Sequence, residues 1–523
     1  MVIRNGYAAL MVDVAEALPE DVGALQHELE RTRYENHELK KELAWYRQQH
    51  RLSQAKRFGA ASDTPPEQHA LLDEPERERH RERTHSVKGH QRRNKGGGGR
   101  APLPDHLPRD VRVHEPTDAQ CSCGCGGELH LIDTEVSEVL EQTPAKLYVV
   151  EHHRRRYGCR CCGDGVCRAP APAVPIPKAR VGAGLLASVV AGKYLEAMPL
   201  YRLAAFYQRH GVDLDRQALA RWCLAAADLV APVIDRLHAV LLTRRVIHVD
   251  ETPVQVLQEA GRSAKKKSTM WVYASGGLDP PIRLYAYQQS SASEHPRRFL
   301  DGFGGYLQSD GFAGYNALVR AQPQIVGVGC WAHVRRKFTD VQKAQAGERP
   351  EGEAACFIKS IRALYQLERR LAGEPASERY RQRQRRAAPI LARIRARLER
   401  TLARVPAKTL LGKALTYMHK QWPQLVRYID DGETAIDNNT AERAIKPFVI
   451  GRKNWMFANT PAGATASANL YGLIETAKAN AIEPYQYLVH LFTELPQRDL
   501  STGDPVDDLL PWNVDRPDPT ITN

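Results

Sequence analysis

The stretch Val246–Leu257, VIHVDETPVQVL, constrains the fold most, because apolar and β-branched residues surround two acids, Asp250 and Glu251. The opening VIHV is typical of a buried strand. A carboxylate inside such a strand is costly to bury unless a cation meets it. A paired arginine and a metal ion are both candidates for that cation. We interpret Asp250 as the first ligand of a metal site.

Length and charge indicate several domains and a polyanionic partner. At 523 residues the chain is too long for one compact core. A formal net charge of +13 favours nucleic acid or an acidic membrane surface as the partner. The best apolar run, near Val181–Gly192, is too short to span a membrane. Two acids in the apolar N-terminal stretch make it a poor signal peptide. We therefore expect no membrane partner.

Residues 1–58 are predicted to form an N-terminal coiled coil, with heptads from about residue 20 to residue 53. Leucine supplies four of the a and d positions: Leu25, Leu29, Leu39 and Leu43. Acidic g positions are matched by basic e positions, and the single polar Asn36 at an a position specifies register and two strands. We predict a parallel homodimer; the alternative is a lone amphipathic surface helix. The highly charged, glycine-rich residues 59–110 are predicted to be a flexible basic linker.

Residues 111–170 are predicted to be a small zinc-binding module, because most of the ten cysteines cluster there. In a large chain without a signal peptide, such clustering indicates metal binding over disulfides. The second pair of ligands is most simply Cys159 and Cys162. The first pair is irregular, although Cys121 and Cys125 have a tolerated spacing. The pattern predicts structural Zn²⁺, with reduced structural thiols as the alternative.

Residues 178–240 are predicted to be a helix-turn-helix DNA-binding domain. One helix, 201–210, leads through the turn GVDLD to a second helix that starts near Arg216. Arg216, Gln217 and Arg221 are the exposed candidates for phosphate or base contact. Any pair of packed helices has the same pattern, so the nearby cysteine cluster and the basic charge are what favour DNA binding.

Two further acids can complete the site that Asp250 begins. Strand-like runs alternate with helical ones after residue 241, which predicts a mixed α/β sheet. One run, GYLQSD, ends at Asp310, where Gly311 allows a tight turn. Acids at adjacent strand ends lie where such a sheet binds ligands. Glu442, just inside a predicted helix, is either a third ligand or the end of a capping box that starts at Asn439.

Other residues near these acids are assigned lesser roles. Glu251 should point to the opposite face of the strand from Asp250. His333 can approach the site, but we favour a packing role over a Cys330–His333 metal pair. The stretch from about 350 to 435 predicts a packed helical insertion with an arginine-rich outer face, for which solvation is favoured over tracking of phosphates. These arginines are Arg379, Arg381, Arg383, Arg393, Arg395 and Arg397.

Five segments resemble the DDE transposases of the insertion-sequence-66 family: HVDETPVQVL, SDGFAGYNAL, CWAHVRRKF, DNNTAERAIKPFVIGRKNWMF and LYGLIETAKANAIEPYQYL. The order of coiled coil, zinc-binding module and helix-turn-helix also resembles that family. The resemblance implies an α/β ribonuclease-H-like catalytic domain over 241–480, with the helical insertion at about 350–435, and a C-terminal helix and tail at 481–523. It implies a catalytic triad of Asp250, Asp310 and Glu442. The irregular first cysteine knuckle departs from the family pattern.

The expected activity follows from three carboxylates that can hold two Mg²⁺ ions, with Mn²⁺ as an alternative. Such a site would free a 3′-hydroxyl at the end of the element and direct it at a target phosphodiester. Four basic residues are expected to contact DNA: Arg443, Lys446, Arg452 and Lys453. The resemblance also implies small accessory proteins of the same element and a place in the bacterial cytoplasm, associated with the nucleoid. The alternatives are a metal-dependent nuclease or resolvase on the same fold and a non-catalytic DNA-binding regulator.

Overall fold

A computed structural model describes residues 22–58, 147–150, 156–158, 166–168, 172–344, 352–499 and 505–514. The chain divides into two compact units. Unit 1 comprises Met1–Glu78, Arg245–His248 and Phe303–Thr440, and unit 2 comprises Arg79–Arg244, Val249–Gly302 and Ala441–Asn523. The predicted linker at 59–110 and the four predicted zinc ligands lie outside the described residues.

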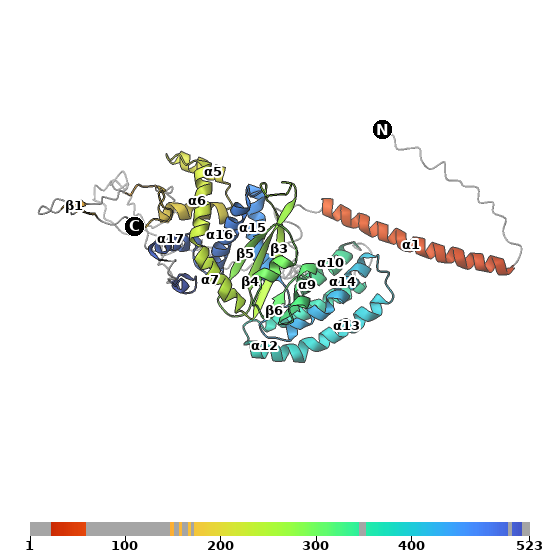
Figure 1. The fold of residues 1–523 in the computed structure, drawn as a ribbon. Coiled ribbons are helices and arrows are strands. Elements are labelled where there is room, and N and C mark those ends of the chain that lie inside the picture. The colour runs from red at the N-terminus through yellow and green to blue at the C-terminus, as the bar shows by residue number, and fades with distance from the viewer. Residues whose placement is uncertain are drawn as a thin grey trace, which may run out of the picture. The chain divides into compact units, whose positions relative to one another are not determined.

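The largest sheet of the described chain has five strands in the order β5-β4-β3-β6-β7. Its strands are β3 (Val246–Gln255), β4 (Lys267–Ser275), β5 (Arg283–Gln288), β6 (Gly305–Gln308) and β7 (Ile325–Val328). The β3–β6 and β6–β7 pairs are parallel, whereas β4 and β5 are antiparallel. The predicted mixed sheet with helices is therefore confirmed (Figure 1).

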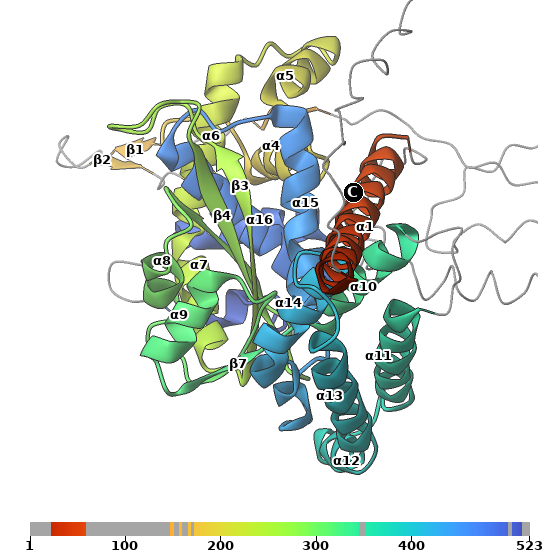
Figure 2. The same cartoon turned by 90° about the vertical axis from the view of Figure 1, so that its right-hand side faces the viewer.

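Unit 1 surrounds β6 and β7 with helices. They are α9 (Ala313–Ala321), α10 (Trp331–Ala344), α11 (Glu353–Arg370), α12 (Ala376–Gln382), α13 (Ala388–Leu402) and α14 (Leu410–Leu425). An apolar stripe of α13 is buried at Leu391, Ile394 and Leu398, while Ile390 and Leu402 pack against the same core. Figure 2 shows α11, α13 and α14 alongside one another. Helices therefore form the stretch predicted to be a helical insertion.

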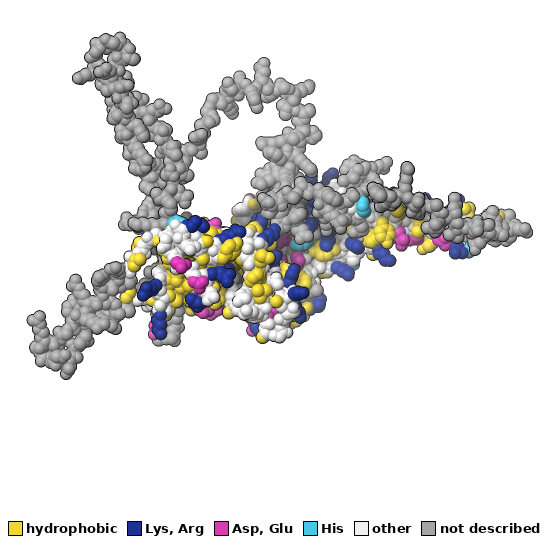
Figure 3. Space-filling view, turned by 90° about the horizontal axis from the view of Figure 1, so that it is seen from above, with side chains coloured by type: hydrophobic (Ala, Val, Ile, Leu, Met, Phe, Trp, Pro, Cys, Tyr) yellow, Lys and Arg dark blue, Asp and Glu magenta, His cyan; other side chains and the backbone are white. Residues whose placement is uncertain are grey.

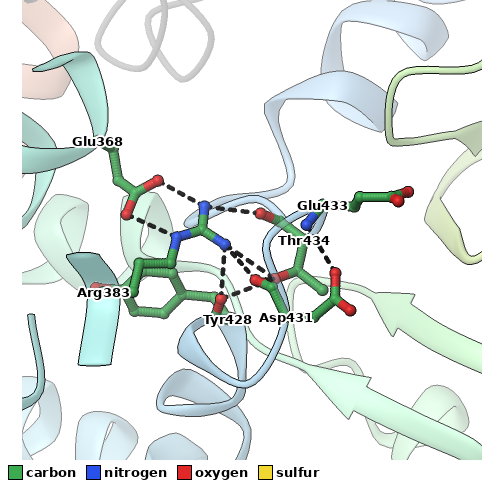
Figure 4. Close-up of polar contacts among 6 residues, drawn as sticks. All are labelled: Glu368, Arg383, Tyr428, Asp431, Glu433 and Thr434. Atoms are coloured by element: carbon green, nitrogen blue, oxygen red, sulfur yellow. Dashed lines mark hydrogen bonds and ion pairs between the residues drawn. The ribbon is translucent and has the colours of Figure 1, made fainter. Parts of the chain in front are cut away.

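Arg383 corrects the predicted arginine-rich outer face, because its side chain is buried with 1% exposure. Its guanidinium donates to Glu368 at 3.0 and 2.6 Å and to the carbonyl oxygens of Tyr428, Asp431 and Thr434 (Figure 4). A π-helical turn, Arg383–Ala387, joins α12 to α13. A π-helical turn contains one more residue than an α-helical turn, so it changes which side chains face the core. Arg383 lies on the side that faces inward.

The N-terminal helix α1 (Val22–Phe58) also belongs to unit 1 and is the longest helix of the described residues. Its heptad leucines are exposed: Leu25 by 38%, Leu29 by 51%, Leu39 by 63% and Leu43 by 50%. A helix with leucines on the outside is not stabilised by the rest of its own chain at those positions. The predicted helix is confirmed, and its pairing with a second copy stays a prediction.

Unit 2 packs helices against β4 and β5. They are α4 (Ala183–Tyr194), α5 (Leu200–Arg209), α6 (Arg216–Leu229), α7 (Ala231–Leu242), α8 (Glu294–Phe299), α16 (Pro461–Ala479) and α17 (Pro484–Glu494), together with most of α15 (Asn439–Trp455). The edge strand β5 is covered by α16, since Thr476 Oγ1 accepts from the backbone N of Arg283 and donates to its backbone O, both at 3.0 Å. This protects the edge from pairing with another strand.

The described surface carries many basic side chains, and no described helix is suited to a membrane. No helix among the described residues combines the length and apolar character needed to cross a bilayer. Lys and Arg side chains lie among hydrophobic ones on the face seen from above (Figure 3). Such a mixture is compatible with contact to a polyanion.

Candidate active site

Asp250 lies in the middle of β3, where the continuous buried run of this strand ends. The four residues before it are buried, and Asp250 and Glu251 are half-buried. The side chain of Asp250 accepts a hydrogen bond from the backbone N of Glu251 at 2.9 Å. Burial raises the pKa of Tyr273 on β4, and the negative charge of Glu251 raises it further.

Asp310 lies two residues past the end of β6 and is half-buried. Its carboxylate accepts from the backbone N of Phe312 at 2.9 Å, and its backbone O accepts from the Tyr417 hydroxyl at 2.7 Å. Gly311 has φ of +86°, a conformation that strongly favours glycine, and a Cβ there would collide with Gln421 of α14. The turn that holds Asp310 is thus fixed locally and from α14.

His333 lies on α10 near Asp310. Burial lowers its pKa to about 4, helped by Arg336 and Lys337 and opposed by the negative charge of Asp310. The imidazole is therefore neutral at pH 7. Cys330 has a contact of its own, because its Sγ accepts from the backbone N of Asn438 at 3.3 Å.

A buried pair missed by the sequence analysis joins β3 to the segment before α15. His248 Nδ1 lies 3.1 Å from Asn438 Oδ1, and both residues are at most 1% exposed. Next to Asn438, Asp437 accepts from the Tyr365 hydroxyl at 2.9 Å and from the backbone N of Asn439 at 3.2 Å. One signal was available in the sequence: His248 precedes Asp250 by two residues and so shares its face of the strand.

Glu442 lies in the first turn of α15 and is half-buried. The predicted alternative, a capping box with Asn439, is wrong, because no described residue donates a hydrogen bond to Asn439 Oδ1. The Asp437 side chain instead accepts from the backbone N of Asn439 at this helix end. A capping box therefore does not explain the position of Glu442.

The predicted DNA contacts lie on two helices of unit 2. Arg216, Gln217 and Arg221 are exposed on α6, which follows α5 through a turn containing Gly211 with φ of +82°. On α15, Arg443 and Lys453 are exposed and Lys446 is half-buried. Arg452 differs from these, since it donates to Thr252 Oγ1 at 3.0 Å and to the carbonyl O of Pro253. Burial lowers the pKa of Arg452, and its contacts fix α15 to β3.

Near the predicted zinc module, β1 (Arg156–Gly158) pairs antiparallel with β2 (Val166–Arg168). The residues between these strands in the sequence include Cys159 and Cys162, which lie outside the described residues together with Cys121 and Cys125.

Comparisons with known proteins match four family models along the chain. Residues 178–466 match the model described as transposase IS66 family, and residues 118–163 match the zinc-finger binding domain of transposase IS66. Residues 472–512 match the IS66 C-terminal element, and residues 45–112 match transposase C of IS166 homeodomain. The zinc-finger match contains all four cysteines predicted to bind zinc.

Relatives in Sinorhizobium fredii (strain NBRC 101917 / NGR234) match most of the chain. The uncharacterized protein y4jD is 34% identical over 79% of this chain and 81% of its own length. The uncharacterized proteins y4qI and y4hP are 32% and 30% identical, each over 80% of this chain, and the matches cover 79% and 77% of their own lengths. With the main family model covering more than half of the sequence, the chain belongs to the IS66 transposase family.

Proposed function

We propose that this transposase binds the ends of its insertion element, hydrolyses a phosphodiester bond there and joins the freed 3′-hydroxyl to target DNA. Asp250, Asp310 and Glu442 are the proposed catalytic residues, in a ribonuclease-H-like domain. Action on DNA agrees with the formal charge of +13 and with membership of the family.

The register of β3 against β6 carries this proposal. The parallel pairs Val246↔Tyr306, Ile247↔Leu307 and His248↔Gln308 all differ by 60 in residue number, as do Asp250 and Asp310. Each acid lies two residues beyond the last of these pairs. β6 ends at Gln308, whereas β3 continues to Gln255, so Asp250 lies where β3 runs past the end of its parallel neighbour. The ends of parallel strands are where such sheets bind ligands. The register therefore supports a shared site for the two acids.

The third acid is linked to this edge by the hydrogen bond between His248 and Asn438. His248 is two residues before Asp250, and Asn438 is four residues before Glu442. Because this one buried hydrogen bond lies close in sequence to both acids, it limits how far β3 near Asp250 and the start of α15 can separate. We assign His248 and Asn438 as positioning residues for Asp250 and Glu442.

The donor chemistry of the three acids fits Mg²⁺ or Mn²⁺. All three residues offer hard carboxylate oxygens and are half-buried. Two such ions, when bound, would activate water and stabilise the charge that develops on the attacking and leaving oxygens. Neutral His333 adds no positive charge that would compete with a cation.

The proposed reaction has two balanced steps. In hydrolysis, a water oxygen forms a bond to phosphorus, and the bond from phosphorus to the 3′-oxygen breaks, leaving a 3′-hydroxyl after proton uptake. In strand transfer, that 3′-oxygen attacks a phosphorus of the target and displaces the target's own 3′-oxygen. One phosphorus–oxygen bond forms for each that breaks, so the joining step needs no nucleotide cofactor.

The test is strand cleavage and joining by purified full-length protein with Mg²⁺ and DNA that ends in the element's terminal sequences. Asp250→Asn, Asp310→Asn and Glu442→Gln should each reduce both products to background, because each removes a charged ligand. Glu251→Gln is the matched control, since it removes the same charge from the adjacent residue. Joining by Asp250→Asn, or equal loss in Glu251→Gln, would show that the triad is misassigned.

The same assay separates the alternatives. Cleavage without joining would identify a nuclease or resolvase, and binding without either product would identify a DNA-binding regulator. End recognition is assigned to α6, so Arg216→Ala and Arg221→Ala should weaken binding to terminal DNA. If α6 reads base edges, these variants should lose not only affinity but also their preference for terminal DNA over unrelated DNA.

We further propose that α1 pairs with α1 of a second copy as a parallel coiled coil. Its exposed heptad leucines support this. Leu39→Asp with Leu43→Asp should convert a dimer to a monomer in sedimentation measurements. Tyr34→Asp is the control, because Tyr34 is 68% exposed and lies outside the a and d positions. Equal mass for wild type and the leucine variant would exclude this dimer. Small accessory proteins of the element remain proposed partners.

Structural Zn²⁺ is proposed at Cys121, Cys125, Cys159 and Cys162, supported by the zinc-finger family match. Metal analysis of the purified full-length chain should find bound zinc that is lost on Cys159→Ser with Cys162→Ser. Cys356→Ser serves as the control, because Cys356 is a free, half-buried thiol on α11. Equal zinc in all three proteins would exclude these ligands.

A further inference from the structure

The loop between β3 and β4, residues 256–266, is fixed by a buried acid. Glu259 is 5% exposed and accepts hydrogen bonds from Ser268, Tyr287 and Arg262. Arg262 also donates to Ser268 Oγ at 2.7 Å. The negative charge of Glu259 is therefore used to neutralise Arg262 inside the base of the loop.

Three consecutive lysines follow this neutralised pair. Lys265, Lys266 and Lys267 are exposed, and none forms an ion pair with a described residue. The turn that holds them is ordered, since the backbone N of Lys266 donates to Ser263 O at 2.9 Å. The result is a compact cluster of positive charge at the end of a hairpin.

The end of α15 lies against the same loop. The backbone N of Ala458 donates to Gln255 O at 2.9 Å, and the backbone N of Leu257 donates to Ala458 O at 3.1 Å. The Gln255 side chain donates to Ala264 O at 2.9 Å. Gln255 therefore bonds to Ala458, which follows Phe457, and to Ala264, which precedes Lys265. These bonds hold the two segments next to each other.

Exposed basic and apolar side chains lie in the last turn of α15 and just after it. Phe457 is 43% exposed, Met456 is 68% exposed, and Lys453 is exposed without an ion pair to a described residue. The sequence contains no acid between Glu442 and Glu475. No nearby carboxylate on this segment offsets the lysines.

We propose that Lys265, Lys266, Lys267, Lys453 and Phe457 form a DNA-binding surface, here called the hairpin surface. The lysines contact backbone phosphates, and the Phe457 ring stacks on an unpaired base next to the contacted strand. The ordered turn keeps its three lysines close together, so that they can contact neighbouring phosphates, and an exposed aromatic ring stacks on any base. The surface is separate from α6 and rests on the proposed function only in requiring that the protein binds DNA.

The experiment compares DNA binding by full-length wild type and a triple variant, Lys265→Gln with Lys266→Gln and Lys267→Gln. Affinity is measured by fluorescence anisotropy over a range of salt concentrations, on an intact duplex and on one with a short single-stranded end. The triple variant should bind both DNAs roughly tenfold or more weakly. Its slope of log affinity against log salt should fall by about 3, near 0.9 for each lost phosphate contact on duplex DNA.

A matched variant removes three exposed lysines of unit 1, by Lys359→Gln, Lys408→Gln and Lys420→Gln, and should keep both affinity and slope. Phe457→Ala should weaken binding roughly fivefold or more to the single-stranded end alone. Equal binding by wild type and the hairpin triple variant, or equal loss in the matched variant, would overturn the hairpin surface. Unchanged binding of Phe457→Ala to both DNAs would overturn the stacking contact. Failure of wild type to bind any DNA would overturn the proposed function as well.

Discussion

Two regions each place a glutamate beside an arginine, yet they leave very different surfaces. The first, here called the node, is Arg383 with Glu368 and the carbonyl groups that Arg383 contacts; the second is the loop between β3 and β4, where Arg262 meets Glu259. At the node, the guanidinium is 1% exposed and meets Glu368 and three carbonyl oxygens. In the loop, Glu259 neutralises Arg262, and the next three lysines remain exposed. One region uses its cation to hold segments of its own chain together. The other keeps its cations available.

This difference shows why the total charge of a chain is a poor guide to where it binds a polyanion. The formal charge of +13 counts Arg383 and Lys266 equally. Only cations that are exposed and unpaired can release counterions on contact with DNA. The helical segment with the densest arginines therefore contributes less to a binding surface than its composition suggests.

The largest predicted effect is at Arg383. Arg383→Leu should lower the stability of the α11–α14 helices by about 3–5 kcal/mol, because it leaves the mostly covered Glu368 carboxylate and three carbonyl groups without their partner. Amide hydrogen exchange in α11 and α13 measures this opening. Arg393→Leu, at an exposed position of α13, should stay within about 0.5 kcal/mol of wild type. Similar exchange in both variants would mean that the node is not structurally important.

A smaller effect is predicted at Glu259. Glu259→Gln should destabilise the loop by about 1–3 kcal/mol, since Arg262 is left mostly buried without a charged partner. Burial raises the pKa of Glu259, but hydrogen bonds from Ser268 and Tyr287 and the charge of Arg262 outweigh it, so the pKa lies below its usual value.

The pH dependence of this stabilisation has a defined sign. A carboxyl with a lowered folded pKa stabilises the fold fully above its unfolded pKa, and the stabilisation is lost as pH falls through the folded pKa. The difference in melting temperature between wild type and Glu259→Gln should therefore be largest at neutral pH and narrow as the pH falls below about 4.5. A difference that is constant with pH would contradict the assigned ionisation.

The comparison also separates what the sequence could predict from what it could not. The strands β3 and β6 and the helices α5 and α6 lie where hydrophobic periodicity and turn residues predict them, because these are local properties of the sequence. Arg383 was misplaced because a π-helical turn shifts the helical phase by one residue, and no sequence period announces such a turn. The same limit applied to the start of α15, where Asp437 accepts the backbone N–H of Asn439 and the expected capping box is absent.

For the candidate site, the sequence supplied the three acids but not their supports. His248 and Asn438 are 190 residues apart, and a hydrogen bond between them follows only from the fold. The contact of Tyr417 with the backbone of Asp310 is equally long-range, spanning 107 residues. A strand pattern can place an acid at the end of a strand. It does not reveal which distant side chain fixes the turn that follows.

The smallest predicted effect is at Glu475, a buried acid that lacks the several partners of Glu368 and Glu259. It is 8% exposed and accepts from Lys478 at 2.8 Å, and Lys478 is itself 40% exposed. Burial raises the pKa of Glu475, opposed by Lys478 and Arg283.

An acid with a raised folded pKa binds more protons in the folded state, so stability should fall as pH rises from about 4.5 through the folded pKa. Glu475→Gln should remove this dependence and raise stability at pH 7 by about 1 kcal/mol. Thermal unfolding at several pH values measures it, with the exposed Glu374→Gln as the control. A less stable Glu475→Gln at pH 7 would show that the pair with Lys478 outweighs burial, and that a single half-exposed lysine can replace a full network.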